Sequence, residues 1–396
     1  MEKIYVLGAC RTAIGSLGGA LKEVGAAKLG EAVLREALVR SGVEGTEVGQ
    51  VVMGNVLQAG QGQNPARQAA VFADIPVTVP AVTLNKVCGS GLYAVNLAAA
   101  LVASGQEECV LIGGMENMSR APHTLQMRWG QKMGNATLRD SMIQEGLWDV
   151  FNDYHMGITA ENVAQKYGIT RQEQDEFSLK SQRKATAAIQ NGRFKDEIVP
   201  VYVPQRKGEA ICFDRDEHVR TDASIEALGK LRPAFRKDGT VTAGNASGIN
   251  DGAAAMVIAS ESFVRKRKLA PQARWICGAS CGVDPSVMGI GPISTVKKAL
   301  RLADMQIENI DLLEANEAFA AQAIAVMRGI GADEEKVNVN GGAIALGHPI
   351  GASGARITVT LLHEMHRRGS KYGLSTLCIG GGMGEAAIFE RDALCK

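Results

Sequence analysis

The sequence predicts an α/β protein made of two related halves, with a long segment inserted into the first half. Short apolar runs alternate with Ala-rich stretches of helical pattern, which is typical of βαβ units in a mainly parallel sheet. Several motifs also occur twice, and such a repeat is strong evidence for the architecture of a chain. A strand–turn–strand unit that is continuous in one copy is interrupted in the other, which locates the insertion.

The individual elements follow from local pattern in chain order. Strands are predicted where Val, Ile and Leu cluster between turn residues, and helices where Ala and Leu recur among charged residues at helical spacing. The predicted strands are an N-terminal run and residues 51–53, 81–84, 110–112, 252–258, 312–313, 374–379 and 385–389. The predicted helices are residues 28–40, 91–103, 158–168, 171–191, 295–303, 318–328 and 354–368.

The repeat is clearest at two glycine-framed turns that carry different reactive side chains. The first elbow (residues 85–91) brings Cys88 to a turn before a helix, and the second elbow (residues 347–354) brings His348 to the matching turn. Their Ser-Gly pairs lie 263 positions apart (353 minus 90), and the Gly-Gly-Met triplets after the next strands lie 268 apart (381 minus 113). One strand after the second elbow, Cys378 adds another thiol. The repeat therefore predicts a thiol-based acyl-transfer site.

The insertion is located by comparing the two copies. In the second copy, the strand at 374–379 turns through residues 380–384 straight into its neighbour, which predicts a hairpin. In the first copy, the strand at 109–112 finds its matching partner only at 252–258. Insertions at such turns usually carry binding function, so we expect a substrate-binding cap. The predicted units are a first half of residues 1–117 plus 251–270, an inserted loop domain of residues 118–250, and a second half of residues 271–396.

The composition excludes several classes of protein. Lys and Arg number 43 against 42 Asp and Glu in 396 residues, so no net charge attracts the chain to nucleic acid or to an anionic membrane. Eight scattered cysteines suit free thiols in a reducing compartment better than a disulfide framework. No apolar run approaches the roughly 20 residues of a membrane span, and the N-terminus has no leader pattern. We therefore expect a cytoplasmic protein with no nucleic-acid or membrane partner.

Cys88 and His348 form a plausible nucleophile and base. Cys88 stands between a predicted strand and a predicted helix, where backbone N–H groups and the helix dipole favour a thiolate. An ordinary thiol of pKa about 8.5 is only slightly ionised at neutral pH, so fast attack needs a base or a lowered pKa. His348, held between Gly347 and Pro349, is suited to take this proton and then to donate a hydrogen bond to a thioester oxygen.

Two other patterns leave alternatives open. Asn316 ends a predicted strand and could either serve the reaction or cap a helix at residues 317–328. Cys277 and Cys281 could form half of a metal site, but no second ligand pair accompanies them, so we interpret them as core thiols and expect no metal. No phosphate-binding loop or dinucleotide fingerprint indicates a competing nucleotide site.

Four separated motifs resemble the thiolase family, most closely its biosynthetic acetyl-CoA acetyltransferase type. They occur in the family's order, and the resemblance extends from one end of the chain to the other. It implies a fold of two βαβαβαββ halves packed into five αβαβα layers, with the inserted loop domain receiving coenzyme A. The motifs are Cys88-Gly89-Ser90, Asn316-Glu317-Ala318-Phe319, Gly347-His348-Pro349 and Cys378-Ile379-Gly380.

The resemblance also implies a role for each site residue. Cys88 is the nucleophile that His348 activates, and Cys378 removes an α-proton from acetyl-CoA. One oxyanion hole consists of His348 with a water held by Asn316, and the other of the backbone N–H groups of Cys88 and Gly380. The implied contacts with coenzyme A are Ser247, Ala243, Phe235, His155, Phe319 and Arg220, and those with a short acyl group are Met156 and Met288.

The resemblance predicts an acetyl-CoA C-acetyltransferase, which reversibly joins two acetyl-CoA into acetoacetyl-CoA and coenzyme A through an acetylated Cys88. The alternatives are a longer-chain 3-ketoacyl-CoA thiolase of fatty-acid degradation and an inactive acyl-CoA-binding or lipid-binding protein of the same fold. Coenzyme A thioesters are the expected substrates, and no permanently bound cofactor is expected. A homotetramer is favoured over a dimer, because the run from Met115 to Met133 resembles that of tetrameric members.

Overall fold

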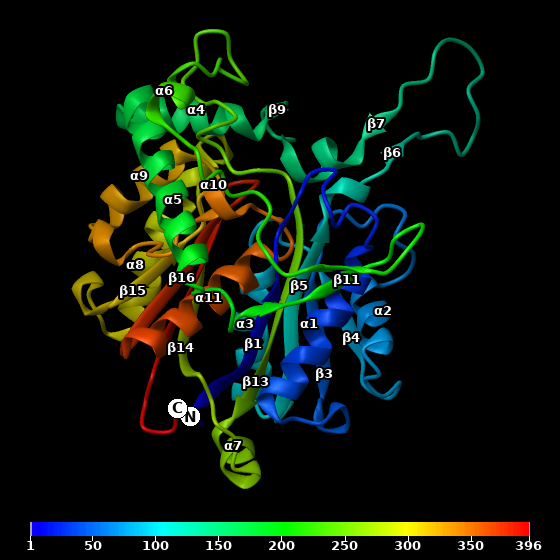
Figure 1. Cartoon of the computed structure of the whole chain (residues 1–396), viewed down its shortest axis with the longest axis vertical. Coiled ribbons are helices and arrows are strands. Elements are labelled where there is room, and N and C mark those ends of the chain that lie inside the picture. The colour runs from blue at the N-terminus through cyan, green and yellow to red at the C-terminus, as the bar shows by residue number, and fades with distance from the viewer. Residues whose placement is uncertain (1, 396) are drawn as a thin grey trace.

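The computed structural model describes residues 2–395, and its backbone is organised around a long mixed sheet (Figure 1). Neighbouring strands are parallel in the βαβ units of each half, but most pairs are antiparallel, both within the halves and where the halves meet. The prediction of a mainly parallel sheet is therefore wrong, because the strands nearest the junction of the halves pair with opposite directions. From one edge to the other the strands are β15 (Leu312–Ala315), β16 (Tyr372–Ile379), β17 (Met383–Glu390), β14 (Ala273–Gly282), β1 (Ile4–Thr12), β13 (Asn250–Ser260), β5 (Cys109–Asn117), β3 (Gln50–Gly54) and β4 (Ala81–Leu84).

Helices cover the outer faces of both halves and fill the space between them. The helices of the first half are α1 (Ala26–Ser41), α2 (Pro65–Phe72) and α3 (Ser90–Ala103), and those of the second half are α8 (Gly291–Ala303), α9 (Ala320–Ile330), α10 (Ala343–Leu346) and α11 (Ser353–Arg368). A short helix, α7 (Glu261–Arg267), follows β13. Every strand and helix that the sequence predicts is present, with ends that differ by a few residues.

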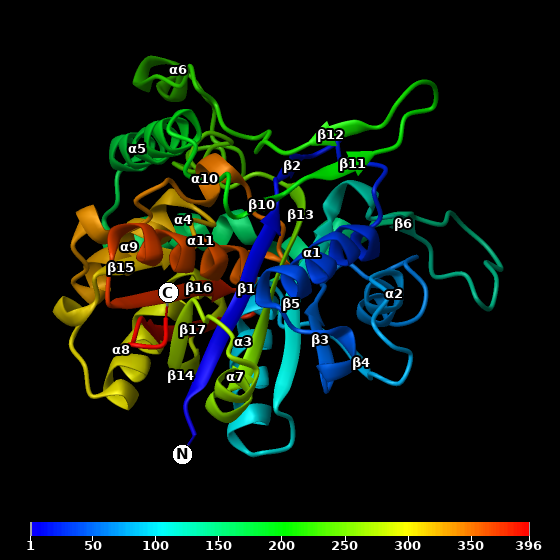
Figure 2. The same cartoon turned by 60° about the horizontal axis from the view of Figure 1, so that its bottom comes forward.

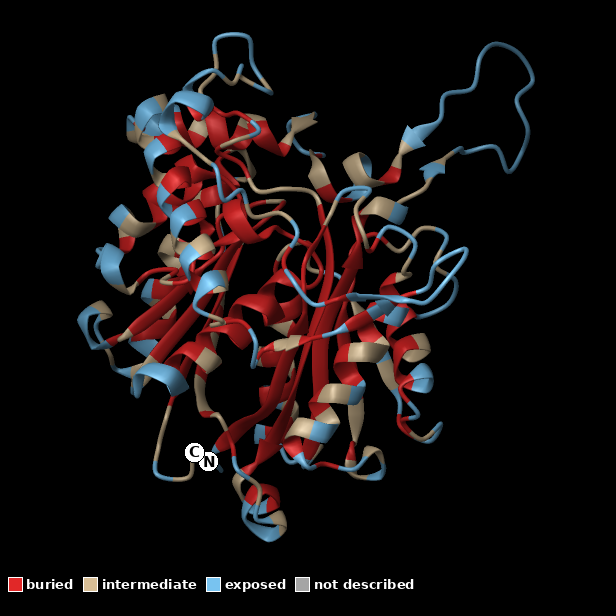
Figure 3. Ribbon diagram, viewed as in Figure 1, coloured by how far each residue is buried: buried red, intermediate tan, exposed pale blue. Residues whose placement is uncertain are grey.

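Three apolar cores account for the layered arrangement. One core joins α1 and α2 to the first half of the sheet, a second lies around α3 and α11 between the halves, and a third joins α8 and α9 to the second half. Most strands and the two middle helices are accordingly buried, whereas the edge strand β4 and the outer helices are partly exposed (Figure 3). The order is thus helix, sheet, helix, sheet, helix, which confirms the predicted fold class.

The second half replaces one strand of the repeat with a side chain. At the position that β4 occupies in the first half, the second half has only an isolated bridge between Leu313 and Val337. Asn338 follows with a positive φ of 44°, which ends extended backbone. Its side chain accepts a hydrogen bond from the N–H of Ala315 (2.9 Å) and donates one to the carbonyl of Ala315 (2.8 Å). The amide group of Asn338 therefore pairs with the edge of β15 as a backbone would.

Much of the segment between β5 and β13 lies outside the layers, with parts of it across the upper part of the view in Figure 2, but its residues Ile198–Val199 pair with β1 of the main sheet. Its two long helices are those that the sequence predicts. Its elements are β6 (His123–Thr124), β7 (Arg139–Asp140), β8 (Trp148–Asp149), β9 (Tyr154–His155), α4 (Met156–Tyr167), α5 (Arg171–Gln190), β10 (Ile198–Val199), β11 (Val201–Val203), β12 (Ile211–Phe213) and α6 (Ile225–Gly229). The proposed boundaries of the three units stay a prediction. No helix within residues 2–395 combines the length and apolarity that a membrane crossing needs.

The two Ser-Gly pairs of the repeat lie where α3 and α11 touch. A Cβ atom on Gly91 would stand 2.5 Å from the backbone nitrogen of Ala355, and one on Gly354 would stand 2.2 Å from that of Leu92. Both distances are far shorter than any side-chain contact, so only glycine allows the helices to approach this closely. This contact sets the distance between the two elbows.

Replacing Gly354 with Ala should separate α3 from α11. The added methyl group meets backbone, which cannot move aside, so we expect the free energy of unfolding to fall by about 1–3 kcal/mol. Gly229→Ala is the matched control, because no atom lies within 4 Å of the added Cβ in that helix. Its higher helix propensity should leave stability unchanged or raise it by up to about 1 kcal/mol. Equal urea midpoints for the two variants would contradict a tight crossing.

Candidate active site

The first elbow holds Cys88 in a strained turn between β4 and α3. The hydroxyl of Ser90 donates a hydrogen bond to the carbonyl of Val87 (2.7 Å) and accepts one from the N–H of Lys86 (2.9 Å). Val87 has a positive φ of 47°, an unfavourable conformation for a β-branched residue. Such strain is found where the fold holds a reactive group in place. The turn thus presents the sulfur of Cys88 in a fixed direction.

The second elbow determines which nitrogen of His348 carries the proton. The backbone N–H of His348 donates to Asn250 Oδ1 (2.9 Å), and His348 Nδ1 lies 2.6 Å from Ser353 Oγ. The Ser353 hydroxyl donates its own hydrogen to the carbonyl of Pro349 (2.9 Å), so it accepts from Nδ1. The proton of the neutral ring therefore sits on Nδ1, and Nε2 is free to accept a proton.

Asn316 faces the free nitrogen of His348. Its side-chain Nδ2 lies 3.4 Å from His348 Nε2, and its Oδ1 is buried without a hydrogen-bond partner among the described residues. The adjacent helix, α9, begins at Ala320, and the residue before it makes no side-chain cap. Of the two alternatives that the sequence left open, helix capping by Asn316 is therefore excluded. An unpaired buried amide oxygen is suited to hold a water molecule or a substrate group.

Cys378 and Gly380 lie against the first elbow at the end of β16. Cys378 is fully buried, whereas Gly380 opens the turn into β17. A Cβ atom on Gly380 would lie 3.3 Å from Val87 and 3.2 Å from Met156. The backbone N–H of Gly380 lowers the pKa of the Cys88 thiol, against the larger effect of burial. The elbow of one half and the hairpin of the other thus converge on one point.

Burial dominates the electrostatics of these groups. It raises the pKa of the Cys88 thiol to about 11, although the backbone N–H groups of Gly380 and of Cys88 itself oppose the shift. Burial and then the charge of Arg356 lower the pKa of His348 to about 3. Burial and then Cys88 raise the pKa of Cys378. The backbone N–H groups favour the thiolate, as expected, but burial outweighs them in the pKa of Cys88, although the residue is partly exposed. These directions favour a thiol beside a neutral imidazole at neutral pH.

An apolar and aromatic cluster next to Cys378 contains most of the predicted acyl and coenzyme A contacts. Phe235 stacks on His155 with ring centroids 4.7 Å apart and meets the edge of Phe319 at 6.3 Å. Met156 and Met288 belong to the same buried cluster as Cys378 and Phe319. His155 also caps α4, since its Nδ1 accepts a hydrogen bond from Gly157 (3.0 Å), and burial lowers its pKa. The cluster joins the inserted segment to the second half of the chain.

The remaining predicted contacts lie at the margin of this cluster. The N–H of Ser247 donates to the carbonyl of Ala318 (3.0 Å), which attaches the segment before β13 to the strand end that carries Asn316. Ala243 and Arg220 are exposed and do not belong to the cluster. Their contacts with coenzyme A stay a prediction, as do the roles of the other predicted site residues.

Two family models match the chain and together cover nearly all of it. The model described as the thiolase N-terminal domain matches residues 4–262, and that of the thiolase C-terminal domain matches residues 269–391. The chain belongs to the thiolase family. An acetyl-CoA acetyltransferase of Pseudomonas aeruginosa is 58% identical over 393 residues, covering 99% of this thiolase and 100% of the relative.

Solved structures of the family superimpose closely on this thiolase. The Bacillus anthracis acetyl-CoA acetyltransferase gives a TM-score of 0.97 at 46% identity, covering 98% of this chain and 99% of that one. Human mitochondrial 3-ketoacyl-CoA thiolase gives a TM-score of 0.96 at 44% identity, covering 99% of both chains. The predicted family and fold are therefore confirmed.

Sequence reasoning missed several polar residues that hold the site of this thiolase together. Ser353 orients His348, although its position five residues later in the same motif was the only signal. Glu116, in β5 of the first half, accepts a hydrogen bond from Gly351 of the second elbow (2.9 Å) and others from Asn55, Val56 and Leu57. Burial raises the pKa of Glu116 to about 7. A carboxylate in an otherwise apolar strand was the signal for it.

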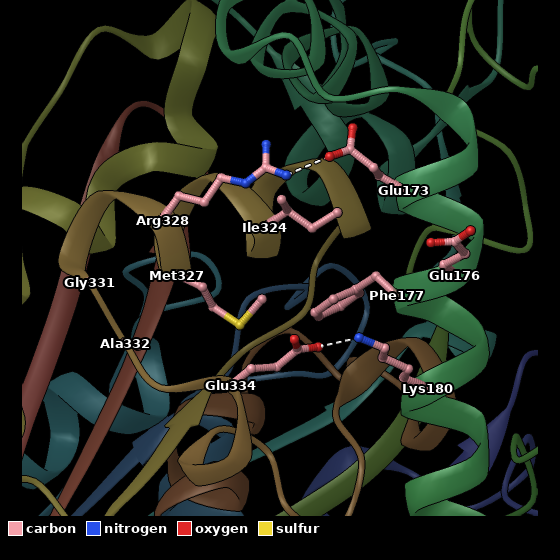
Figure 4. Close-up of a pocket in the computed structure, with 10 residues that line it drawn as sticks. All are labelled: Glu173, Glu176, Phe177, Lys180, Ile324, Met327, Arg328, Gly331, Ala332 and Glu334. Carbon is pink, nitrogen blue, oxygen red and sulfur yellow. Dashed lines mark hydrogen bonds and ion pairs between the residues drawn. The ribbon is translucent and has the colours of Figure 1, made fainter.

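A surface groove of about 460 Å³ lies between α5 and α9 and is separate from the catalytic candidates (Figure 4). Its floor is formed by Phe177, Ile324 and Met327, and ion pairs link its two walls. The pairs are Arg328 with Glu173, and Lys180 with Glu334. None of the predicted site residues lines this groove.

The structure also shows the state of the cysteines and of the possible metal ligands. All eight cysteines are free thiols, as predicted. Cys277 is buried and its sulfur donates to the carbonyl of Ala299 (3.3 Å), as expected for a core thiol. Within residues 2–395, no three His, Cys, Asp or Glu side chains are grouped so that they could hold a metal ion.

Alkylation of Cys88 by iodoacetamide should report its raised pKa. With a pKa of about 11, the thiolate is scarce at pH 7 and increases about tenfold per pH unit up to pH 10. Site-resolved mass spectrometry compares this rate with that of Cys212, which is exposed and provides an internal control. A Cys88 rate that exceeds that of Cys212 at pH 7, or levels off below pH 8, would indicate a resting thiolate–imidazolium pair instead.

Proposed function

We propose that this thiolase is an acetyl-CoA C-acetyltransferase that condenses two acetyl-CoA into acetoacetyl-CoA and coenzyme A, and that it also catalyses the reverse reaction. The observation that carries the proposal is the convergence of Cys88, His348 and Cys378 at the contact between the two halves. Relatives that share more than half of its residues over the whole chain bear the name acetyl-CoA acetyltransferase, which supports the same activity.

In the first half-reaction, the sulfur of Cys88 attacks the carbonyl carbon of acetyl-CoA while Nε2 of His348 takes its proton. The oxygen of the tetrahedral intermediate becomes negative close to the backbone N–H groups of Cys88 and Gly380, which stabilise it. The intermediate collapses, the bond to the sulfur of coenzyme A breaks, and that sulfur takes a proton from Cys378. Acetyl-Cys88, protonated His348 and the thiolate of Cys378 remain.

In the second half-reaction, Cys378 removes an α-proton from a second acetyl-CoA. The enolate oxygen receives a hydrogen bond from protonated Nε2 of His348 and from a water held by Asn316. The α-carbon forms a bond to the acetyl carbon on Cys88, and the thioester bond to Cys88 breaks. The proton on His348 returns to the sulfur of Cys88, so all groups regain their initial protonation states.

The acyl chain is proposed to be short. Met156 and Met288 are buried in the cluster with Cys378, and Phe319 closes its side. Flexible but bulky Met side chains leave room for acetyl and acetoacetyl groups rather than a long chain. The competing candidate is a longer-chain 3-ketoacyl-CoA thiolase, which the close superposition on the human mitochondrial enzyme of that name favours.

Two measurements test the function. Thiolysis of C4 and C10 3-ketoacyl-CoA should show higher kcat/KM for C4, and brief incubation with acetyl-CoA should give an acetyl adduct on Cys88 by mass spectrometry. Cys88→Ala should reduce kcat by about a thousandfold or more, whereas Cys212→Ala, at an exposed thiol, should not. Faster C10 cleavage would favour the longer-chain enzyme. Folded wild-type protein that forms no adduct would favour the inactive binding protein.

A homotetramer is proposed for the assembly. The arm between β6 and β7 extends from the body of the molecule (Figure 1) and exposes Trp129 (92%) and Met133 (89%), together with Met127 and Leu138. Exposed apolar side chains on an extended arm favour contact with another copy of the chain. Coenzyme A thioesters are the proposed substrates, and a cytoplasmic location stays a prediction.

Trp129→Ser combined with Met133→Ser should convert the tetramer into dimers without loss of fold. The expected result is half the mass by size-exclusion chromatography with light scattering, because the arm loses its apolar contact area. Val39→Ser is the control, since Val39 is also an exposed apolar residue (71%) but lies on α1. A dimeric wild-type protein, or a tetramer that persists in the double variant, would contradict the proposed role of the arm in tetramer assembly.

A further inference from the structure

Two buried charged residues, Arg356 and Glu314, lie on the elements that carry Ser353 and lead to Asn316. Arg356 stands three residues after Ser353 on α11, so both side chains lie on one face of that helix. Glu314 stands two residues before Asn316 at the end of β15, so these two also share a face. Arg356 Nη1 lies 3.8 Å from Glu314 Oε2. The pair therefore joins the element that orients His348 to the element that carries Asn316.

The pair is unusual because it is buried but not hydrogen-bonded. Arg356 and Glu314 are 1% and 3% exposed, yet no described residue hydrogen-bonds to any guanidinium nitrogen of Arg356 or to Oε2 of Glu314. At 3.8 Å the two groups attract each other without a hydrogen bond. The buried Arg11 shows the contrast, since its guanidinium bonds to Glu197 (2.6 Å) and to Asp216 (2.7 and 2.9 Å). An unsatisfied buried cation is costly, so stability does not explain Arg356.

We propose that Arg356 is a positioning residue for the thiolase reaction, whose fixed positive charge behind His348 makes the protonated imidazole a stronger hydrogen-bond and proton donor. This inference rests on the proposed function and deepens it. A more acidic imidazolium stabilises the enolate oxygen of the second acetyl-CoA more strongly, and it returns its proton to Cys88 more readily when the product forms. Arg356 acts through His348 and touches neither substrate.

No surrounding carboxylate is hydrogen-bonded to Arg356, because Glu197 and Asp216 bind Arg11 instead. Burial raises the pKa of Glu314 to about 8 even though Arg356 opposes the shift, so Glu314 can hold a proton at pH 7. Arg356 lowers the pKa of His348, in addition to the larger effect of burial. The groups that face Arg356 from other elements are Glu314, Arg11, Glu197 and Asp216. Among the catalytic residues, Glu116 adds to the effect of burial in raising the pKa of Cys88. In the same way, Cys88 adds to the effect of burial in raising the pKa of Cys378.

The decisive variant is Arg356→Met, which keeps an unbranched side chain but removes the charge. We expect kcat for thiolysis to fall about tenfold with KM for coenzyme A unchanged, and any acid limb of kcat/KM to move up by about one pH unit. The melting temperature should change little, because the buried Glu314 carboxyl that is left behind has a raised pKa and can take up a proton. Arg356→Lys, which restores a positive charge, should recover most of the lost kcat and the wild-type pH profile.

Two further variants separate charge from shape. Glu314→Gln keeps the cation and removes the titratable carboxyl group, so the acid limb of kcat/KM should stay in place or move to lower pH. If Arg356→Met does not fold, the double variant Arg356→Met with Glu314→Gln removes both charges and should show the same loss of kcat. Parallel loss of activity and melting temperature in the Met variants, no recovery in the Lys variant, or an upward pH shift in Glu314→Gln would overturn the proposal.

A failure of the proposed role of Arg356 can be distinguished from a failure of the proposed function. A wild-type protein without thiolysis activity refutes the function itself. An active wild type whose kcat and pH profile are unchanged by Arg356→Met refutes only the role of Arg356. The comparison of melting temperatures is independent of either result.

Discussion

The close contact between α3 and α11 is the constraint on which the site depends. Each helix begins at an elbow, and the glycines at the crossing let the two backbones touch without intervening side chains. The distance between the elbows therefore follows from backbone geometry, which varies little, rather than from side-chain packing. Cys88 and His348 come from halves of the chain that are far apart in sequence, yet neither needs a flexible segment to reach the other.

The site combines reactive groups with an environment that suppresses their charges. Burial makes the thiols of Cys88 and Cys378 poor acids and the imidazole of His348 a poor base. Proton transfer between them is then unfavourable until a substrate carbonyl supplies an oxygen to stabilise. Water and unrelated electrophiles meet an unreactive thiol, whereas a bound thioester meets a nucleophile, a base and preorganised donors at once. The same low-dielectric surroundings would strengthen the effect of the Arg356 charge on His348.

The repeat, the strands, the helices and the family were predictable because each rests on local pattern or on matched motifs. The side-chain pairing of Asn338 and the role of Glu116 were not, because each depends on a partner more than one element away. The tautomer of His348 was not either, because it depends on the direction in which one nearby hydroxyl donates. The backbone donors that lower the pKa of Cys88 were predicted, but the larger and opposite effect of burial was not. Backbone donors around a turn can be inferred from sequence, but the depth at which a turn is buried cannot. Ala243 and Arg220 remain unplaced for a different reason, since exposed residues have few protein contacts that define their role.

The glycine crossing also explains why the duplication is still visible in this sequence. At the pseudo-twofold axis, equivalent segments of the two copies contact each other. A larger residue in either copy would therefore clash with the backbone of the other. Elsewhere each copy has its own neighbours, and the two sequences are free to diverge into a nucleophile, a base and a cap. The Ser-Gly pairs by which the repeat is recognised are thus the positions where the two copies contact each other.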